Sequence, residues 1–403
     1  MSEQPTVDPR GAHFWTPFTR ITSSGRYVAE IDGLRFIAIA AVILFHVGIT
    51  MARRDRSPGE ADAVAPFLRL TAPGQFGVQL FFAISGYVLT QPFAECARTG
   101  GEISLGGYYR RRFLRIEPPF VLSCVVYYGV QLARDFAVAR DAFPHFVATL
   151  GYCHNIAYGG LSPINNVTWS LEIEVQFYLL APLLAWLALR GSPRVRQVAL
   201  GAVIVGLATA FAVIGGQGRV PFAWSRSIVF QLPYFLVGML LADLQTDAAA
   251  ARREGRAVWD AVCVAAGAFL FVALGPDADA VSVSPNWRSM LLPPAVFLSL
   301  LGMFRGRFCV QVMRLRWIAL LGGMCYTIYL YHFPLVRIAV GAAARVSTGS
   351  AALDAGVAVL ASAALVTLVC ALLFVLTERP FMDRRWPSKL ARAVRGRAAR
   401  TWG

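Results

Sequence analysis

Residues 31–48, IDGLRFIAIAAVILFHVG, form an apolar run that is interrupted by two ionisable side chains, Arg35 and His46. At about 100° and about 1.5 Å per residue, the eleven steps between them return both to nearly one helix face, about 16 Å apart along the axis. An ionisable group at bilayer depth is costly and usually faces a protein interior or a wet cavity. The run therefore predicts a membrane helix on which Arg35 and His46 share one functional face. The alternative is that Arg35 extends to the lipid headgroups and His46 is a hydrogen-bonded core residue.

The composition of the whole chain points the same way. Of its 403 residues, 57% are hydrophobic and 15% are charged, and the mean hydropathy is +0.55, which is too apolar for a soluble domain. A net charge of +15 in a soluble chain would suggest nucleic acid, but here the arginines lie mostly in short loops between apolar runs. We therefore predict a membrane protein whose charges set topology, with the lipid bilayer and not nucleic acid as its partner.

Ten apolar runs are long enough to cross a bilayer, which predicts an all-α polytopic membrane protein with about ten transmembrane helices around a central cavity. The region 143–158 is a candidate re-entrant or interfacial piece. The predicted division is a cytoplasmic N-terminal segment (1–30), a transmembrane domain (31–377) and a basic cytoplasmic tail (378–403). The runs are 31–50, 75–94, 118–134, 168–189, 197–215, 224–243, 257–274, 288–304, 317–341 and 354–377.

The loop charges predict the orientation of these spans. With both termini in the cytoplasm, the inner loops and tails hold 26 Lys and Arg residues and the outer loops hold nine, as the retention of positive charge inside requires. The first outer loop, with four arginines, opposes the trend. The tail is either an amphipathic helix on anionic lipid or a solvated segment. Seven scattered cysteines without a CxxC pair indicate neither a disulfide framework nor a metal site.

Several short patterns each allow a functional and a structural interpretation. Asp32 is a candidate helix cap, and Ser85 and Gly86 form a small surface that suits either a slender ligand or helix packing. Arg112 and Arg115 stand one helical turn apart, in a cluster that either binds phosphates or is an ordinary positive-inside loop.

Two carboxylates and a row of aromatic residues complete the candidates. Glu172 and Glu174 point about 200° apart on a helix, so they cannot serve one site equally. Glu174 either orients His46 or pairs with an arginine, and Glu172 faces a polar partner or the headgroup zone. The remaining candidates lie on predicted spans and offer either cavity groups or interfacial anchors: Trp169, Ser170, Tyr326, Tyr329 and His332. His13, His145 and His154 have no partner spacing and are interpreted as bystanders.

Five motifs in order resemble the membrane-bound acyltransferase-3 family over residues 30–383. They are the DGLR sequence with His46 in the first run, FGVQLFFAISGYVL (76–89), RRRFLRIEPPF (110–120), NNVTWSLEIEVQFYLLAP (165–182), and CYTIYLYHFPL followed by TERPF. Each motif alone is weak, but five in register are specific. The departures are small: Tyr87 and Phe120 replace other aromatic residues, and Glu172 adds a second carboxylate.

The resemblance implies an integral O-acyltransferase of a bacterial inner membrane. It would move a small acyl group, such as acetyl, from acyl-CoA to a hydroxyl of a carbohydrate, a glycolipid or a glycosylated metabolite, without a permanently bound cofactor or metal. Direct transfer and a transient acyl-histidine both stay open. The implied site residues are His46 as general base with Glu174; Arg35, Arg112, Arg115, Ser85 and Gly86 for the donor; and Trp169, Tyr329 and His332 on the acceptor side or in the cavity.

The alternative function is a transporter or exporter of a polar or acylated metabolite, using the same buried ionisable residues as a pathway. Many secondary transporters are built from internal repeats. No repeat is obvious in this sequence, which counts mildly against transport.

Overall fold

Helices form the ordered structure of the residues that the computed structural model describes, and no strand occurs among them. Those residues are 16–21, 28–54, 58–216, 221–246, 255–274, 287–346, 348–383 and 386–388. His13 and the basic tail from residue 389 onward lie outside them, as does most of the predicted N-terminal segment. The longer helices are α2 (Ala29–Ala52), α3 (Pro58–Thr71), α4 (Gly77–Thr99), α5 (Leu105–Arg134), α6 (Phe136–Leu150), α7 (His154–Tyr158), α8 (Thr168–Ala188), α9 (Pro193–Gly216), α11 (Ile228–Thr246), α13 (Ala257–Leu274), α14 (Trp287–Arg305), α15 (Arg307–Met313), α16 (Arg316–Gly323), α17 (Cys325–Ala343) and α18 (Ala351–Leu373).

Each of the ten predicted runs contains a helix, but fewer than ten qualify as spans. By length and composition, six helical stretches of the described residues could cross a membrane, or eight if two bent pairs each count as one span. The pairs are α14 with α15, bent by 84°, and α16 with α17, bent by 78°. The supported number of spans is therefore six to eight. The two predicted runs that do not qualify correspond to α4 and α13.

The third predicted run and the candidate re-entrant piece illustrate how the helices differ from the predicted boundaries. The third was expected to begin at residue 118, but α5 begins at Leu105, where Ser104 caps the helix by accepting the Gly107 N–H at 3.1 Å. The arginine cluster therefore lies inside a helix and not in a loop before it. The region 143–158 divides between α6 and the single turn of α7, neither of which is a span candidate.

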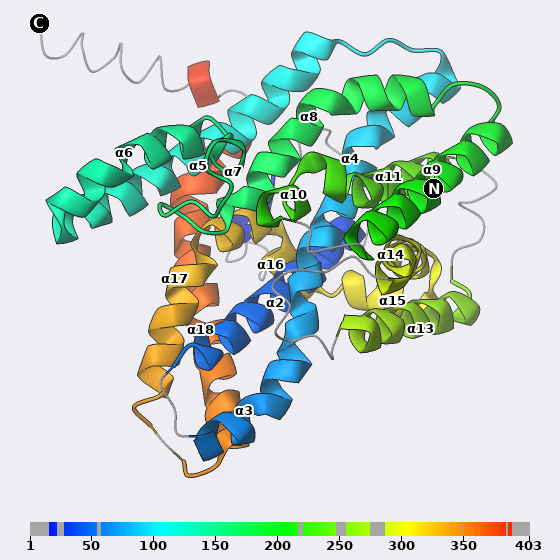
Figure 1. The fold of residues 1–403 in the computed structure, drawn as a ribbon. Helices are drawn as coiled ribbons and strands as arrows, with labels where there is room; N and C mark the ends of the chain where they lie inside the picture. Colours follow the sequence, from blue (N-terminus) through cyan, green and yellow to red (C-terminus); the bar gives the residue numbers. More distant parts are fainter. Residues whose placement is uncertain are drawn as a thin grey trace, which may run out of the picture.

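Glycines allow a close crossing of α4 and α11 in the middle of the bundle. Figure 1 shows α2 and α4 in the middle, with α17 and α18 on one side and α13, α14 and α15 on the other. Helices α4 and α11 share the most extensive contact among the described helices. A Cβ at Gly86 would lie 2.1 Å from the Phe235 carbonyl oxygen, and one at Gly238 would lie 2.0 Å from that of Ala83. Only glycine permits this approach of two backbones, so Gly86 faces α11.

Proline residues inside helices release carbonyl groups, and side chains from other helices bind them. Pro334 has no N–H, so the Leu330 carbonyl one turn earlier in α17 lacks its helical donor. The Tyr127 hydroxyl donates to this oxygen at 2.9 Å, and the Asn165 side chain donates at 3.1 Å. Since lipid offers no donors, these contacts satisfy the carbonyl and fix α17 against α5 and the start of α8.

The same arrangement recurs at two other prolines. The Tyr178 carbonyl, released by Pro182, accepts from Tyr108 at 3.3 Å, and the Leu114 carbonyl, released by Pro118, accepts from the Trp386 indole at 3.2 Å. Helix-interior prolines and donors from other segments thus occur together, so the carbonyls that lack a helical donor are also points of attachment between helices.

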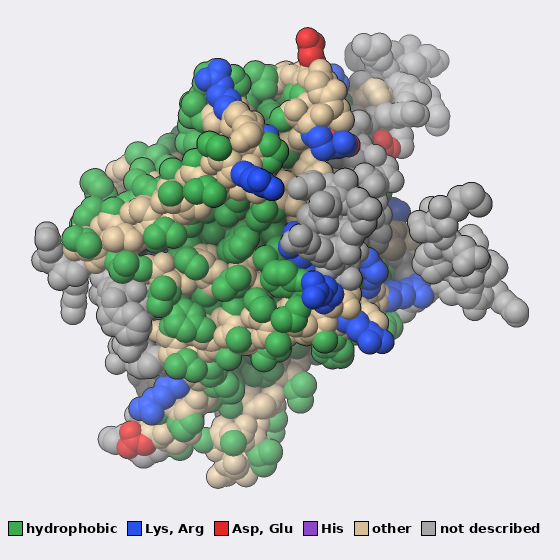
Figure 2. Space-filling view, turned by 90° about the vertical axis from the view of Figure 1, so that its right-hand side faces the viewer, with side chains coloured by type: hydrophobic (Ala, Val, Ile, Leu, Met, Phe, Trp, Pro, Cys, Tyr) green, Lys and Arg blue, Asp and Glu red, His purple; other side chains and the backbone are tan. Residues whose placement is uncertain are grey.

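One face of the molecule carries a broad apolar area. Figure 2 shows hydrophobic side chains over most of this face, with Lys and Arg side chains toward its margins. Val198 of α9 is 73% exposed and Val264 of α13 is 68% exposed. Soluble monomers rarely expose so large an apolar patch, whereas lipid tails cover one without cost.

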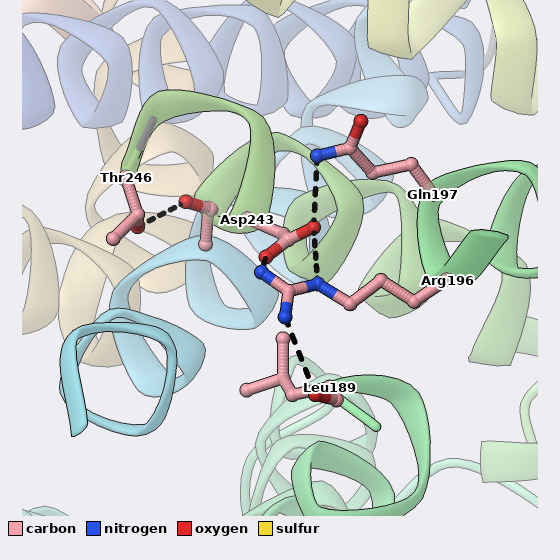
Figure 3. A network of polar contacts seen from close by, with 6 residues as sticks. Leu189, Arg196, Gln197, Asp243 and Thr246 are labelled. Carbon is pink, nitrogen blue, oxygen red and sulfur yellow. Dashed lines mark hydrogen bonds and ion pairs between the residues drawn. The ribbon is translucent and has the colours of Figure 1, made fainter. Parts of the chain in front are cut away.

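A buried ion pair connects α9 to α11 near the α8–α9 turn (Figure 3). Arg196 donates to both carboxylate oxygens of Asp243, with Nε 3.0 Å from Oδ2, and Gln197 donates to the same Oδ2 at 3.0 Å. Arg196 also donates to the Leu189 carbonyl at 3.4 Å. Because Asp243 is only 3% exposed, removing its charge leaves a guanidinium with little access to water.

We expect Asp243→Asn to lower the free energy of unfolding by about 3 kcal/mol, the usual effect of removing one partner of a buried pair. The measurement is the melting temperature of the purified protein in detergent. The control is Asp141→Asn, because the Arg140–Asp141 pair is 73% exposed on both sides and such pairs contribute little. Equal melting temperatures for the two variants would contradict the prediction.

Candidate active site

A cavity of about 310 Å³ lies among α2, α4, α5, α8, α11 and α17. Its walls include all but one of the residues that the sequence singled out for a site. The exception is Gly86, whose close contact with α11 makes it a packing residue. The predicted residues that line the cavity are Arg35, His46, Ser85, Arg112, Arg115, Trp169, Glu174, Tyr329 and His332.

His46 on α2 contacts a second histidine, His332 on α17. The two rings lie 4.9 Å apart between centroids, and His46 Nδ1 is 3.0 Å from His332 Nε2. His46 is half-buried, whereas His332 is 0% exposed. The edge of Phe333 packs on His46 with centroids 5.0 Å apart. The site therefore contains a histidine pair in which His332 is fully buried and His46 is half-buried.

Glu174 has neither of the two partners considered from the sequence among the described hydrogen bonds and ion pairs. It accepts from the Ser85 hydroxyl at 2.5 Å and from the Tyr178 hydroxyl through a short hydrogen bond. Arg112 lies over the Tyr178 ring, 5.9 Å from its centroid. The carboxylate thus connects α4 to α8 in the cavity wall and lies within electrostatic range of Arg35. None of the described hydrogen bonds joins it to His46.

Asp32 holds two arginines instead of capping α2. The helix begins at Ala29, one turn earlier than predicted, so Asp32 lies in the first turn. Its carboxylate accepts from Arg20 at 2.6 Å and from Arg35 at 2.7 Å. Burial, together with the nearby charges of Arg115 and Arg35, lowers the pKa of Arg20 to about 9, which reflects the excess of positive charge at this end of the cavity.

Glu378 supplies a second carboxylate to the same end of the cavity. It accepts from the Thr327 backbone N–H at 3.0 Å and from its hydroxyl at 2.6 Å, so it satisfies the first turn of α17. Arg115 lies within electrostatic range of both Arg35 and Glu378. Arg20 and Glu378 were not among the predicted site residues, because no spacing pattern joins either of them to Arg35. Glu378 did carry a signal, since it belongs to the TERPF motif.

The Tyr329 hydroxyl is engaged by the backbone of α8. It donates to the Val167 carbonyl at 2.5 Å, accepts from the Leu171 N–H at 3.2 Å and lies 3.0 Å from the Ser170 hydroxyl. A phenol has one hydrogen and two lone pairs, so this group is fully used. Tyr329 therefore lines the cavity, as the sequence predicted, while its hydroxyl group fixes the start of α8.

Trp169 presents its ring to the cavity near the same helix start. The guanidinium of Arg226 lies over this ring, 5.0 Å from its centroid. Asn155 donates to the Arg226 carbonyl at 3.0 Å. In turn, Glu172 accepts from the Asn155 backbone N–H at 3.0 Å, so the extra carboxylate of this motif has the polar partner that the sequence predicted and stabilises α7.

The two remaining described histidines contact each other outside the cavity. His145 Nδ1 lies 2.9 Å from His154 Nε2, and His154 Nδ1 lies 3.2 Å from the Gly160 carbonyl. Burial lowers the pKa of His154 below its usual range. Their spacing of nine residues gave no sign of this contact, because it depends on the turn between α6 and α7.

Comparisons with known proteins agree with the geometry. Residues 28–376 match a family model described as an acyltransferase domain. The O-acetyltransferase OatA of Staphylococcus aureus is 26% identical over 337 residues, which are 78% of this chain and 51% of that protein. The peptidoglycan O-acetyltransferase OatA of Listeria monocytogenes is 30% identical over 203 residues, 47% of this chain and 29% of that protein. The chain thus aligns with about half or less of these relatives, and no solved structure matches it.

Proposed function

The chain belongs to the acyltransferase-3 family, and from this premise we propose that it transfers a small acyl group, such as acetyl, from acyl-CoA to a hydroxyl of a carbohydrate, a glycolipid or a glycosylated metabolite. One observation carries the proposal: Arg35 and His46 line the same cavity from one helix, together with Arg112 and Arg115 of α5. The cavity thus offers a cationic end for an anionic donor and an imidazole for the acceptor hydroxyl.

The donor assignment rests on charge. The described residues at the Arg35 end include four arginines, Arg20, Arg35, Arg112 and Arg115, against three carboxylates, Asp32, Glu174 and Glu378. The planar guanidinium fork matches phosphate oxygens, and CoA carries a pyrophosphate and a 3′-phosphate. The phosphates of acyl-CoA would therefore bind at this end, and the loop charges of the sequence predict that it faces the cytoplasm.

The chemistry requires only groups that the cavity contains. As the acceptor oxygen attacks the thioester carbonyl carbon, His46 takes the hydroxyl proton, and the carbon–sulfur bond then breaks. The leaving thiolate of CoA takes the proton back from His46, so the enzyme returns to its starting state. Glu174, through Ser85 and Tyr178, holds the cavity wall next to Arg112.

A carbohydrate acceptor is supported by the relatives and by Trp169. One relative is named for peptidoglycan, a carbohydrate polymer. Trp169 lines the cavity as a large aromatic surface, with the Arg226 guanidinium over its ring. The pair therefore offers an apolar surface and a polar group to a sugar ring.

The test of this function is acyl transfer by the purified protein in detergent. Labelled acetyl-CoA and a panel of saccharide acceptors should give labelled ester and free CoA in equal amounts. A transporter has no compartments to connect in detergent, so it would leave acetyl-CoA intact. Unchanged acetyl-CoA with every acceptor, from protein that is monodisperse, would contradict the proposed function.

A free cysteine reports on the donor position. Cys325, at the start of α17, is 8% exposed and lines the cavity within electrostatic range of Arg35. We expect CoA to slow the reaction of Cys325 with a small thiol reagent several-fold, as measured by mass spectrometry of the labelled peptides. Cys263 of α13 is also 8% exposed but lies outside the cavity lining, so its reaction should not change. Equal rates at Cys325 with and without CoA would contradict donor binding at this end.

A further inference from the structure

The contacts of His332 determine which of its nitrogens carries hydrogen. Its Nδ1 is 3.0 Å from the Ile328 carbonyl oxygen and 2.9 Å from that of Tyr329. Carbonyl oxygens only accept hydrogen bonds, so Nδ1 of His332 must be the protonated nitrogen. In the neutral ring, Nε2 then has a lone pair and is an acceptor.

This assignment determines the state of His46 in turn. His332 Nε2 is 3.0 Å from His46 Nδ1. Because His332 Nε2 has a lone pair and accepts, His46 Nδ1 carries the hydrogen and donates it. The neutral His46 ring then has its own lone pair on Nε2, the nitrogen that is not engaged by His332. That is the form of histidine that can accept a proton from a hydroxyl.

We propose that His332 is a positioning residue that holds His46 in its proton-accepting tautomer and shares the charge that forms on it. The inference rests on the proposed function, because it assigns a second residue to the same proton transfer. Once His46 Nε2 has taken the hydroxyl proton, the His46 Nδ1–H becomes a charge-assisted donor to His332, which is shorter and stronger than a neutral one. If the proton moves on to His332 Nε2, both N–H groups of His332 still have acceptors.

This role is usually filled by a carboxylate next to a catalytic histidine, and the cavity carboxylate Glu174 is engaged elsewhere. A neutral partner suits a membrane interior, because it adds no second charge that must be buried. His332 belongs to the cavity wall but is 0% exposed, and in this proposal it acts through the half-buried His46.

The fold fixes the position of His332 next to His46. Two residues further along α17, Pro334 releases the Leu330 carbonyl, and Tyr127 and Asn165 bind that oxygen at 2.9 and 3.1 Å. Phe333, next to His332 in α17, packs on the His46 ring. His332 is therefore held by two backbone carbonyls of its own helix, and that helix is fixed in place by Tyr127 and Asn165.

The first test needs no variant of the site. The chain has five histidines, so protein labelled with ¹⁵N at histidine gives a small set of NMR signals, which single His→Gln variants assign. We expect both His46 and His332 to have their hydrogen on Nδ1 near neutral pH. An Nε2–H tautomer at His46 would overturn the inference.

The second test separates positioning from packing. His332→Leu should lower kcat about 100-fold, within the range usual for loss of an orienting partner, while the dissociation constant of CoA stays within twofold. His332→Gln keeps an acceptor oxygen near the position of Nε2 and should recover about tenfold of that loss. The control is Tyr331→Phe on the same helix, which is buried against Tyr127 and outside the cavity lining, and its kcat should equal that of the wild type.

The outcomes distinguish this inference from the function on which it rests. Full kcat in His332→Leu, or equal losses in kcat and CoA binding, would overturn the positioning role while acyl transfer by the wild type stands. Equal kcat in the Leu and Gln variants would also overturn it, because a purely steric role does not depend on an acceptor atom. Absence of transfer by the wild type would instead remove the proposed function.

Discussion

His46→Ala is expected to lower kcat for acyl transfer by about 10² to 10⁴, the usual contribution of a positioned general base. The variant removes the imidazole but leaves Arg35 and Asp32 in place at the other end of the cavity. The dissociation constant of CoA should therefore stay within twofold of the wild-type value. The measurements are initial rates with labelled acetyl-CoA and equilibrium binding of CoA.

A matched substitution separates loss of the base from loss of structure. His145→Ala also removes a half-buried imidazole with a histidine partner, but it lies outside the cavity lining, and its kcat should be unchanged. A His46→Ala protein with wild-type kcat would show that another group removes the proton. Loss of CoA binding together with kcat would show that His46 is needed for the shape of the cavity.

Arg115→Gln is expected to raise KM for acetyl-CoA by about 10- to 100-fold, because a hydrogen bond to a charged group contributes about 1.5–3 kcal/mol. The effect should depend on the phosphates of the donor. With acetyl-pantetheine, which lacks the nucleotide phosphates, KM should be nearly the same in the variant and in the wild type. Steady-state rates with the two donors give the comparison directly.

The control for Arg115→Gln is Arg111→Gln, one helical turn earlier in α5. Arg111 is exposed and absent from the cavity lining, so its loss changes the surface charge by the same amount without touching the site. Its KM should stay close to the wild-type value. If Arg115→Gln raised KM equally for both donors, Arg115 would have a role in helix packing and not in phosphate binding.

The sequence predicted which ionisable residues line the cavity, because the membrane makes such residues informative. Arg35, His46 and Glu174 stand in runs where lipid would penalise them, so their presence alone indicates an interior cavity, and all three line one. The family resemblance then supplied an expected role for each residue. The sequence could not predict partners, because which residue faces His46 depends on the relative height and rotation of α2 and α17.

The predicted helix boundaries were wrong where contacts from other segments change a local preference. The third run was predicted to begin at Pro118, yet α5 runs through this residue, and the Trp386 indole binds the carbonyl that the proline releases. Asp32 had the identity and place of a cap, but Arg20 and Arg35 compete for its carboxylate. The bends at α14–α15 and α16–α17 were also missed. The run 317–341 spans the one-residue break at Met324, over which hydropathy averages, and α15 lies beyond the end of the run 288–304.

The carbonyls released by proline also constrain the order in which the bundle can be completed. The donors for Leu330 and Tyr178 lie earlier in the chain than the carbonyls themselves, so they are already present when those helices are synthesised. The Leu114 carbonyl is different, because its donor is Trp386, 272 residues later. We expect α5, which carries Arg112 and Arg115, to reach its final form only after the segment around Trp386 docks, so that synthesis through residue 386 precedes completion of the cationic wall of the cavity.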